Sequence, residues 1–363
     1  MVATAQRFSE LNPGVEITWE KRSLQDFADQ PIDHLAERYD LLVIDHPWVG
    51  FASASGLLLP LDNHLSAAFL ADQAAHAVGL SHRSYIVNGR QWALAIDAAA
   101  PVASWRPDLL PAEGQPTTWS GLLEMARAGK VLMPGIPTDT LMNFYMLCST
   151  LGEDIGQEED GVVSRRVGEL ALGMLRELAL LIDPVFWNLN PIRVYEAMTL
   201  TDRYAYCPFA YGYSNYSRAG YARTLLDFGD IVEIEGRRAR TTLGGAGLAV
   251  SAGCREREAA LGYAAFLADP VCQQTLYYDS GGQPGHRSAW MDERVNALCR
   301  NYFLNTLPVL DRAFLRPCFP GYIHFQDRAG VVIRDYLRDG GDSQEVLTRL
   351  DALYRQSRRD ARQ

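Results

Sequence analysis

Hydrophobic and polar positions follow two different periods along this chain. Short apolar runs bounded by polar, Gly or Pro residues predict buried strands, at residues 15–19, 41–44, 92–96, 131–133 and 248–250. Longer segments with apolar residues three and four positions apart predict amphipathic helices, at residues 120–128, 140–151, 165–181, 193–199, 256–268 and 343–361. Strands that alternate with helices are typical of an α/β architecture, and here we expect largely parallel sheets.

The first residues have a helical pattern of their own. Val2, Ala5 and Phe8 fall on one side of a helix, and no basic leader is followed by an apolar core. The segment therefore does not read as a signal peptide. It looks like the middle of a helix whose preceding strand is absent.

A glycine-rich segment late in the chain combines two loops with a strand and a helix. Gly244 and Gly245 come just before the last predicted strand, and they predict a loop whose main chain can approach a bound molecule. After the predicted helix, the Gly- and Pro-containing residues 281–285 predict a rigid, exposed bend that presents His286 and Arg287.

Several phrases of the sequence occur in an order that resembles one known family. They are FSELNPGVEI at 8–17, YDLLVID at 39–45, GLLLPLD at 56–62, the Gly-Gly pair, FLADP at 266–270 and the Gly-Pro bend. Together they resemble the bacterial extracellular solute-binding proteins of the carbohydrate type, the soluble receptors of ABC transporters. Since a fold can host many functions, the site is argued separately from the residues.

The resemblance implies a two-lobed, type II periplasmic-binding-protein-like fold with a hinge and a ligand cleft between the lobes. Lobe 1 is expected to comprise residues 1–98 plus 245–290, and lobe 2 residues 99–244 plus 291–363. The resemblance also implies a periplasmic monomer that binds a small-molecule solute and presents its closed form to an ABC transporter permease. No catalysis, cofactor or metal is implied.

Composition narrows the function classes. The chain has 363 residues, 48% of them hydrophobic, which is enough for two domains of about 100–200 residues each. The net charge of -10 disfavours binding to nucleic acid, which needs a concentrated basic face. No run of about 18 uncharged apolar residues occurs, so a membrane span is not expected. The six cysteines are scattered without metal-type spacing, which argues against a zinc site and fits a reducing compartment slightly better. The cytoplasm therefore stays open beside the periplasm.

Candidate ligand residues in lobe 1 follow its predicted strands, because ligands in open α/β sheets lie beyond the carboxyl ends of strands. Asp45, His46 and Trp48 come directly after residues 41–44, and Asp97 lies at the first crossing between the lobes. A carboxylate accepts hydrogen bonds from hydroxyl or ammonium groups, and an indole covers an apolar or cationic face. The alternatives are that Asp45 caps the next helix, that Trp48 packs between elements, and that Asp97 serves the hinge.

Lobe 2 contributes an aromatic stretch. Tyr211 and Tyr213 flank a glycine and are candidate cleft residues, whereas we expect Phe209 to be buried in the core. Trp187 is a further candidate, with the end of a helix as its alternative role. The tyrosine faces suit a sugar ring and equally a quaternary ammonium group.

Two features of the glycine-rich segment bear on the ligand. Many sugar-binding members of the family have Trp after the Gly-Gly pair, where this chain has Ala246, which favours a smaller sugar, a polyol or another organic solute over a large oligosaccharide. Arg287 can grip an acidic group with two hydrogen bonds, and its alternative role is to brace the Gly-Pro bend.

Two other function classes stay open at this point. Asp45, His46, Asp97 and His286 are candidate acid–base residues of a cytosolic hydrolase or transferase, although no nucleophile-elbow, Walker A, zinc-protease or dinucleotide motif is present. The third class is a cytoplasmic solute sensor on the same fold.

Overall fold

The computed structural model describes residues 1–22, 32–111, 114–157 and 161–360. The chain divides into two compact units, each built from separated segments. Unit 1 comprises Met1–Ala99, Gly244–Asn296 and Cys318–Pro320, and unit 2 comprises Ala100–Leu243, Ala297–Pro317 and Gly321–Gln363. Relative to the boundaries expected from the sequence, unit 1 also takes in residues 99, 244, 291–296 and 318–320.

Unit 1 is built around a three-stranded sheet. Its order is β1 (Leu41–Ile44), β8 (Gly244–Val250) and β4 (Leu94–Ala99), with both neighbours antiparallel to β8. The expectation of largely parallel sheets is therefore wrong for the named strand pairs. The reason is the position of β8, which follows residues 100–243 of unit 2 in the sequence. It inserts between β1 and β4, which do not pair with each other, and runs in the direction opposite to both.

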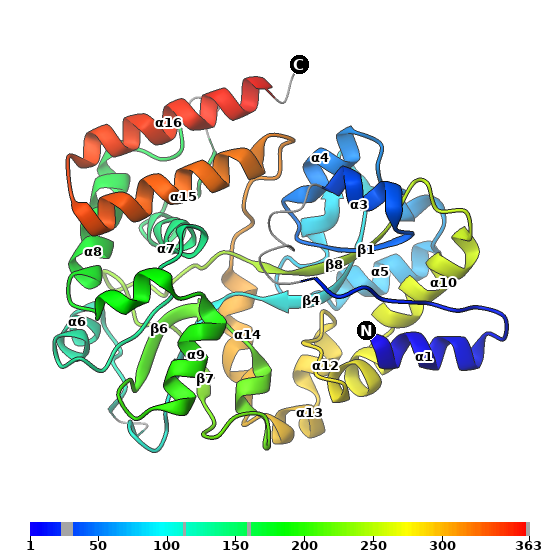
Figure 1. Ribbon diagram of the computed structural model, residues 1–363, viewed down its shortest axis with the longest axis horizontal. Helices are drawn as coiled ribbons and strands as arrows, with labels where there is room; N and C mark the ends of the chain where they lie inside the picture. The colour runs from blue at the N-terminus through cyan, green and yellow to red at the C-terminus, as the bar shows by residue number, and fades with distance from the viewer. Residues whose placement is uncertain (23–31, 112–113, 158–160, 361–363) are drawn as a thin grey trace. The chain divides into compact units, whose positions relative to one another are not determined.

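Helices cover both faces of this sheet (Figure 1). On one face, α1 (Val2–Leu11) and α10 (Arg257–Ala268) share a core with Leu248 and Val250. On the other, α3 (Ile32–Arg38) and α4 (Trp48–Ala54) share a core with Ala249. This alternation along β8 is the two-residue period of a strand that is buried on both faces.

The remaining elements of unit 1 are short. They are η1 (Leu61–Asn63), α5 (Ala67–Ala75), η2 (Arg83–Tyr85), β2 (Ile86–Val87), β3 (Arg90–Gln91), α11 (Pro270–Cys272), the π-helical segment η6 (Gln273–Tyr277), α12 (Arg287–Met291) and α13 (Glu293–Leu298), which continues past the unit boundary.

Unit 2 combines a second antiparallel sheet with long helices. The sheet order is β6 (Tyr206–Tyr211), β5 (Pro101–Trp105) and β7 (Asp227–Gly229). The other elements are α6 (Trp119–Arg127), α7 (Pro137–Thr150), α8 (Arg165–Ala179), η4 (Pro184–Asn188), α9 (Pro191–Leu200), η5 (Ser214–Ser217), α14 (Tyr302–Arg312), α15 (Tyr322–Asp339) and α16 (Ser343–Asp360). Helix α7 is buried from Asp139 to Thr150 and packs against α15 and α8, and α16 lies beside α15 (Figure 1).

Side-chain caps explain where several of these helices begin. The Ser164 hydroxyl accepts a hydrogen bond from Val167 N at the start of α8, and Thr118 does the same for α6. Asn190 caps α9, whose first residue is Pro191. Each oxygen satisfies a backbone N–H that the first turn cannot pair internally.

The helices expected from the sequence are all present, within a few residues, over the described part of the chain; the expected last residue of the C-terminal helix, 361, lies outside it. Two of the expected strands are not formed. Residues 15–19 form no strand, although Val15, Ile17 and Trp19 pack on the core as an alternating pattern predicts. Residues 131–133 contribute only one isolated parallel bridge, between Val131 and Tyr206. In both places the pattern predicted which side chains are buried but not a paired strand.

The N-terminal helix is present, but its buried face differs from the expected one. Thr4, Ala5 and Phe8 are buried, whereas Val2 is 73% exposed. Among the described helices, none combines the length and the hydropathy that crossing a bilayer requires.

Candidate functional site

Asp97 lies in the middle of β4 at an irregularity of the strand pairing. It is opposite Ala246 of β8 on one edge and forms an isolated bridge with Pro284 on the other. Its side chain is partly exposed and, within the described part of the chain, makes no hydrogen bond or ion pair. Desolvation raises the pKa of the Asp97 carboxyl to about 7. This carboxylate has lost water without gaining a protein donor, so a donor from a ligand would be favourable there.

Gly244 and Gly245 do not form the expected loop; they are the first residues of β8. Gly245 has φ +113°, and a Cβ added there would come 2.3 Å from the Asp97 carbonyl oxygen. Glycine is therefore required by the close approach of β4 rather than by a turn. Because β1 ends at Ile44 opposite Gly247, β8 extends beyond the paired end of β1 over these glycines.

Asp45 and His46 follow the end of β1 directly. An Asp45 carboxylate oxygen accepts a hydrogen bond from His46 N at 2.8 Å and lies 3.5 Å from His46 Nδ1. The His46 ring is buried, and Asp45 is partly exposed. Asp45 does not cap the next helix through its side chain, since the N-cap of α4 is Pro47. It therefore stays a candidate ligand residue near the start of β8.

Trp48 is the first residue of α4 and is partly buried. It packs on the core beneath that helix and meets Phe51 edge-on, with ring centroids 6.4 Å apart. This matches the packing role that the sequence offered as an alternative to ligand contact.

The Gly-Pro segment is not the exposed bend that we expected, because residues 283–286 are buried. It runs along the free edge of β4: Gln283 Nε2 donates to Ala98 O at 3.0 Å, and a Cβ at Gly285 would meet Ala95 O at 2.5 Å. Arg287 Nε donates to Ala77 O at 2.9 Å, which is the bracing role foreseen as its alternative.

Tyr277 was not predicted from the sequence. It is buried, and desolvation followed by the negative charge of Asp97 raises the pKa of its hydroxyl well above the usual range. It ends the π-helical turn η6, and π-helical turns are frequent at functional sites. The only sequence signal was its place just before the glycine-rich segment.

The unit 2 candidates divide into two places. Tyr211 ends β6, where its hydroxyl is 3.0 Å from Thr242 Oγ1 and its carbonyl accepts from Tyr195 Oη at 3.0 Å. Tyr213 meets Tyr195 edge-on, with centroids 6.3 Å apart. Tyr195 and Thr242, which the sequence did not single out, thus position the end of β6. Phe209 is buried, as expected.

Trp187 belongs to a different element, η4. It packs against Phe186 with ring centroids 4.1 Å apart, and its carbonyl accepts a hydrogen bond from Arg334 Nη2. Trp187 therefore stays a candidate on a different element from the two tyrosines.

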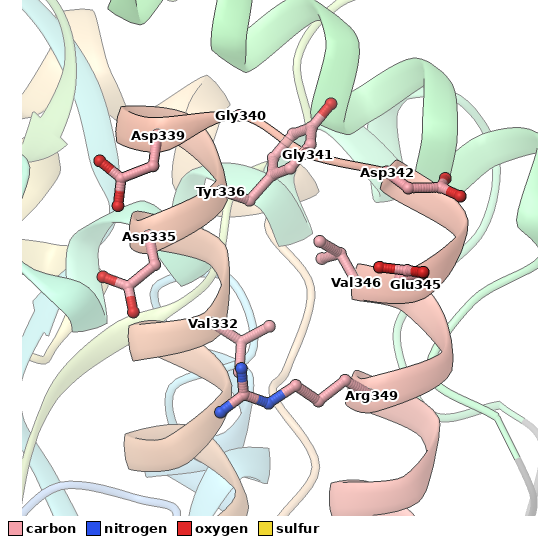
Figure 2. A pocket seen from close by; sticks show the side chains of 10 residues that line it. All are labelled: Val332, Asp335, Tyr336, Asp339, Gly340, Gly341, Asp342, Glu345, Val346 and Arg349. Carbon is pink, nitrogen blue, oxygen red and sulfur yellow. The ribbon is translucent and has the colours of Figure 1, made fainter.

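Two surface hollows lie away from all of these residues. One is at the junction of α15 and α16 and is lined by Val332, Asp335, Tyr336, Asp339, Gly340, Gly341, Asp342, Glu345, Val346 and Arg349 (Figure 2). Its carboxylates do not converge: Asp335 and Asp339 point away from α16 and share Arg338 as their partner. The second is at the amino end of β1, around Asp40, whereas Asp45 follows the other end.

Two α/β units, each with candidate ligand residues at strand ends, are typical of proteins that bind small solutes. The family described as bacterial extracellular solute-binding protein matches residues 3–290. The chain belongs to this family, whose members bind small-molecule solutes and work with ABC transporter permeases. That membership gives it a solute-binding role and does not favour the enzyme or sensor alternatives.

Solved structures agree on the fold. T. maritima MalE3 bound to maltose is 19% identical, with 97% of this chain and 94% of that chain covered and a TM-score of 0.81. A solute-binding protein of Agrobacterium radiobacter K84 in complex with ribitol is 18% identical over 98% and 94%, with a TM-score of 0.83. UgpB of Mycobacterium tuberculosis in complex with glycerophosphocholine is 16% identical over 99% and 95%, with a TM-score of 0.78. No curated protein matches the chain.

Proposed function

We propose that this protein is a periplasmic, monomeric substrate-binding component of an ABC importer, and that its solute is a small sugar, a polyol or a related organic molecule. Family membership supports the receptor role. The choice among solutes depends on the residues, because the solved relatives are bound to ligands as different as maltose, ribitol and glycerophosphocholine.

The proposal depends chiefly on the environment of the Asp97 carboxylate. Its partly exposed carboxylate is desolvated and makes no hydrogen bond to a described residue, while its backbone is fixed by β8 on one edge and Pro284 on the other. Hydroxyl groups of a sugar or polyol donate hydrogen bonds to such a carboxylate, and a hydrogen bond to a charged acceptor contributes about 1.5–3 kcal/mol. A cationic solute would satisfy the same group.

The other candidates have complementary roles in this proposal. Asp45 adds a second acceptor directly after β1, and Gly244 and Gly245 offer main-chain groups to the ligand at the start of β8. Tyr211 and Tyr213 of unit 2 supply apolar ring faces with hydroxyl groups, which suit the C–H faces of a sugar. Ala246, where a tryptophan platform is common in the family, favours a small solute.

The first test is a thermal-shift screen against sugars, polyols, organic acids and betaines, followed by calorimetric titration of each hit. A solute that binds only the folded protein raises the melting temperature in a dose-dependent way. No shift with any of these classes contradicts the proposed solute range.

Two substitutions then test the residues. Asp97→Asn should raise the Kd at least about tenfold without lowering the melting temperature, because it removes a charge from a desolvated position. Tyr211→Ala should raise the Kd about five- to tenfold through loss of ring contact. The matched controls are Glu16→Gln and Tyr221→Ala, at exposed positions. If Asp97→Asn binds the solute as tightly as Glu16→Gln does, Asp97 does not contact the ligand.

A further inference from the structure

Three metal-ligating side chains of unit 1 converge outside the candidate ligand site. Asp72 and His76 are one turn apart, on α5 and at its C-cap, and His286 follows the Gly-Pro segment. One potential ligand atom from each residue lies within 4.8 Å of the other two. His76 Nδ1 is 2.8 Å from an Asp72 carboxylate oxygen, and His286 Nε2 is 3.4 Å from the other oxygen. The two imidazole rings stack, with centroids 5.0 Å apart.

Backbone contacts hold the three side chains in this arrangement. Ala77 and His286 form an antiparallel bridge, and Arg287 N donates to His76 O at 2.7 Å. The Arg287 side chain donates to Ala77 O. The segment that carries His286 is thus fixed to the end of α5 by main chain as well as by side chains, so the donors need no large rearrangement to act together.

We propose that Asp72, His76 and His286 form a binding site for a divalent transition metal, with Zn²⁺ as the best match. Two imidazoles and one carboxylate are a common three-residue ligand set for Zn²⁺, and the fourth position is then taken by water or another small ligand. Ligand atoms about 2.0–2.1 Å from a tetrahedral ion lie roughly 3.3 Å from one another. The 2.8 Å and 3.4 Å distances run to the two different oxygens of Asp72. With one ligand atom from each residue all separations are within 4.8 Å, so side-chain rotation has to bring the three atoms closer together around an ion.

The surroundings supply an orienting partner and an entry path. Ser288 fixes the His286 ring from both its groups: its backbone N donates to Nδ1 at 3.3 Å, and its Oγ lies 2.7 Å from the same atom. Binding of an ion by Nε2 requires the tautomer with the proton on Nδ1, for which Ser288 Oγ is then the acceptor, as orienting partners of ligating histidines are. The His286 side chain is buried, but those of His76 and Asp72 are 48% and 41% exposed, so an ion reaches the site from solvent.

A bound ion would fasten the Gly-Pro segment to α5. That segment also forms the bridge between Pro284 and Asp97. The spacing in the sequence gave no sign of such a site, because Asp72 and His286 are 214 residues apart.

The test uses full-length, tag-free protein treated with a chelator and then dialysed, without added solute. Calorimetric titration with Zn²⁺ should show one site per chain, and saturating Zn²⁺ should raise the melting temperature. Co²⁺, as a spectroscopic substitute, should give visible absorption of the intensity expected for a four-coordinate site. Absence of both a Zn²⁺ heat and a Co²⁺ band from the wild-type protein overturns the proposal.

Variants separate this site from incidental binding at other histidines. His76→Ala, at an exposed position, should weaken Zn²⁺ binding by about a hundredfold or more, beyond the 10–100-fold typical of residues that only orient a ligand. Ser288→Ala should weaken it about tenfold. His64→Ala, an exposed histidine of the same unit, is the matched control and should bind like wild type. Equal Zn²⁺ affinity in His76→Ala and His64→Ala overturns the assignment, whatever the outcome of the solute screen.

Discussion

A single carboxylate illustrates how folding can prepare a residue for a ligand. Asp97 is desolvated by β4, β8 and the Gly-Pro segment, so its pKa is about 7 instead of 3.8. Burial of a charge without a partner costs free energy that a ligand donor can recover. At pH 7 the free protein therefore holds Asp97 about half protonated, and a complex with a hydroxyl or ammonium donor favours the ionised acid.

The consequence is a pH-dependent affinity. A ligand that prefers ionised Asp97 binds only the ionised fraction, which is about one tenth at pH 6 and about nine tenths at pH 8, so the Kd of an uncharged polyol or sugar should be about tenfold higher at pH 6. Calorimetric titrations across this range measure the effect. Asp97→Asn should flatten the profile, and a wild-type Kd that is constant from pH 6 to pH 8 contradicts the proposed contact.

Gly245 tests the packing behind the same residue. With φ +113° and a Cβ position 2.3 Å from Asp97 O, Gly245→Ala must push β8 away from β4. We expect a loss of about 2–3 kcal/mol of stability and weaker solute binding. Gly253→Ala in the same unit is the control, because its Cβ would only touch Ser251 Oγ at 3.6 Å. Chemical denaturation measures both variants; equal midpoints would show that β8 absorbs the methyl group without strain.

For single residues, the sequence predicts which positions are candidates for the site better than it predicts which other residues surround them. Asp97 could be singled out because it follows a run of apolar residues. Tyr277 could not, since its proximity to Asp97 depends on packing between segments far apart in the chain. Gly244 and Gly245 were expected in a loop because glycines usually mark turns, whereas here the requirement is the approach of a distant strand.

The elements show the same contrast. Helices with an uninterrupted apolar stripe, such as α8, were predicted closely, whereas α14 and α15 were not. Helix α14 contains Pro308, which normally ends a helix. Helix α15 contains Gly330, where a Cβ would meet Pro137 O at 2.7 Å, so the glycine that weakens the helical pattern permits close packing on the start of α7.

Helix α7 carries a buried carboxyl in its first turn. Among the described residues Asp139 Oδ2 has no hydrogen-bond partner, and desolvation raises the pKa of Asp139 to about 8. The folded protein therefore holds this proton more tightly than the unfolded chain does, and the contribution to stability falls as the pH rises from about 4 to about 8. Asp139→Asn, which mimics the protonated acid, should match wild type near pH 4 and be more stable at pH 8, by up to about 5 kcal/mol.

Thermal and chemical denaturation at the two pH values check this prediction. The control is Asp33→Asn, an N-terminal-turn carboxylate of α3 that is not fully buried. An Asp139→Asn variant that is less stable than wild type at pH 8 would mean that the carboxylate has a stabilising partner in solution.

At the scale of the whole molecule, composition and the order of motifs gave the family, since the chain is long enough for two cores and its phrases occur in the family's sequence order. They did not give the direction of the strands. Pairing direction depends on where the returning segment inserts, and β8 carries no mark of this in its own apolar pattern. The same is true of the Asp72, His76 and His286 cluster, which only the folded chain brings together.

The central position of β8 also determines when the sheet of unit 1 can form during protein synthesis. A ribosome releases β1 and β4 first, and neither strand can pair with the other in the native sheet. The strand that joins them is translated only after residues 100–243, which are all of the unit 2 sequence that precedes it. Because protein synthesis proceeds at about 5–20 residues per second, the first hundred residues spend seconds with their apolar strands unpaired. The N-terminal segment therefore gains its native three-stranded sheet only when Gly244–Val250 has emerged.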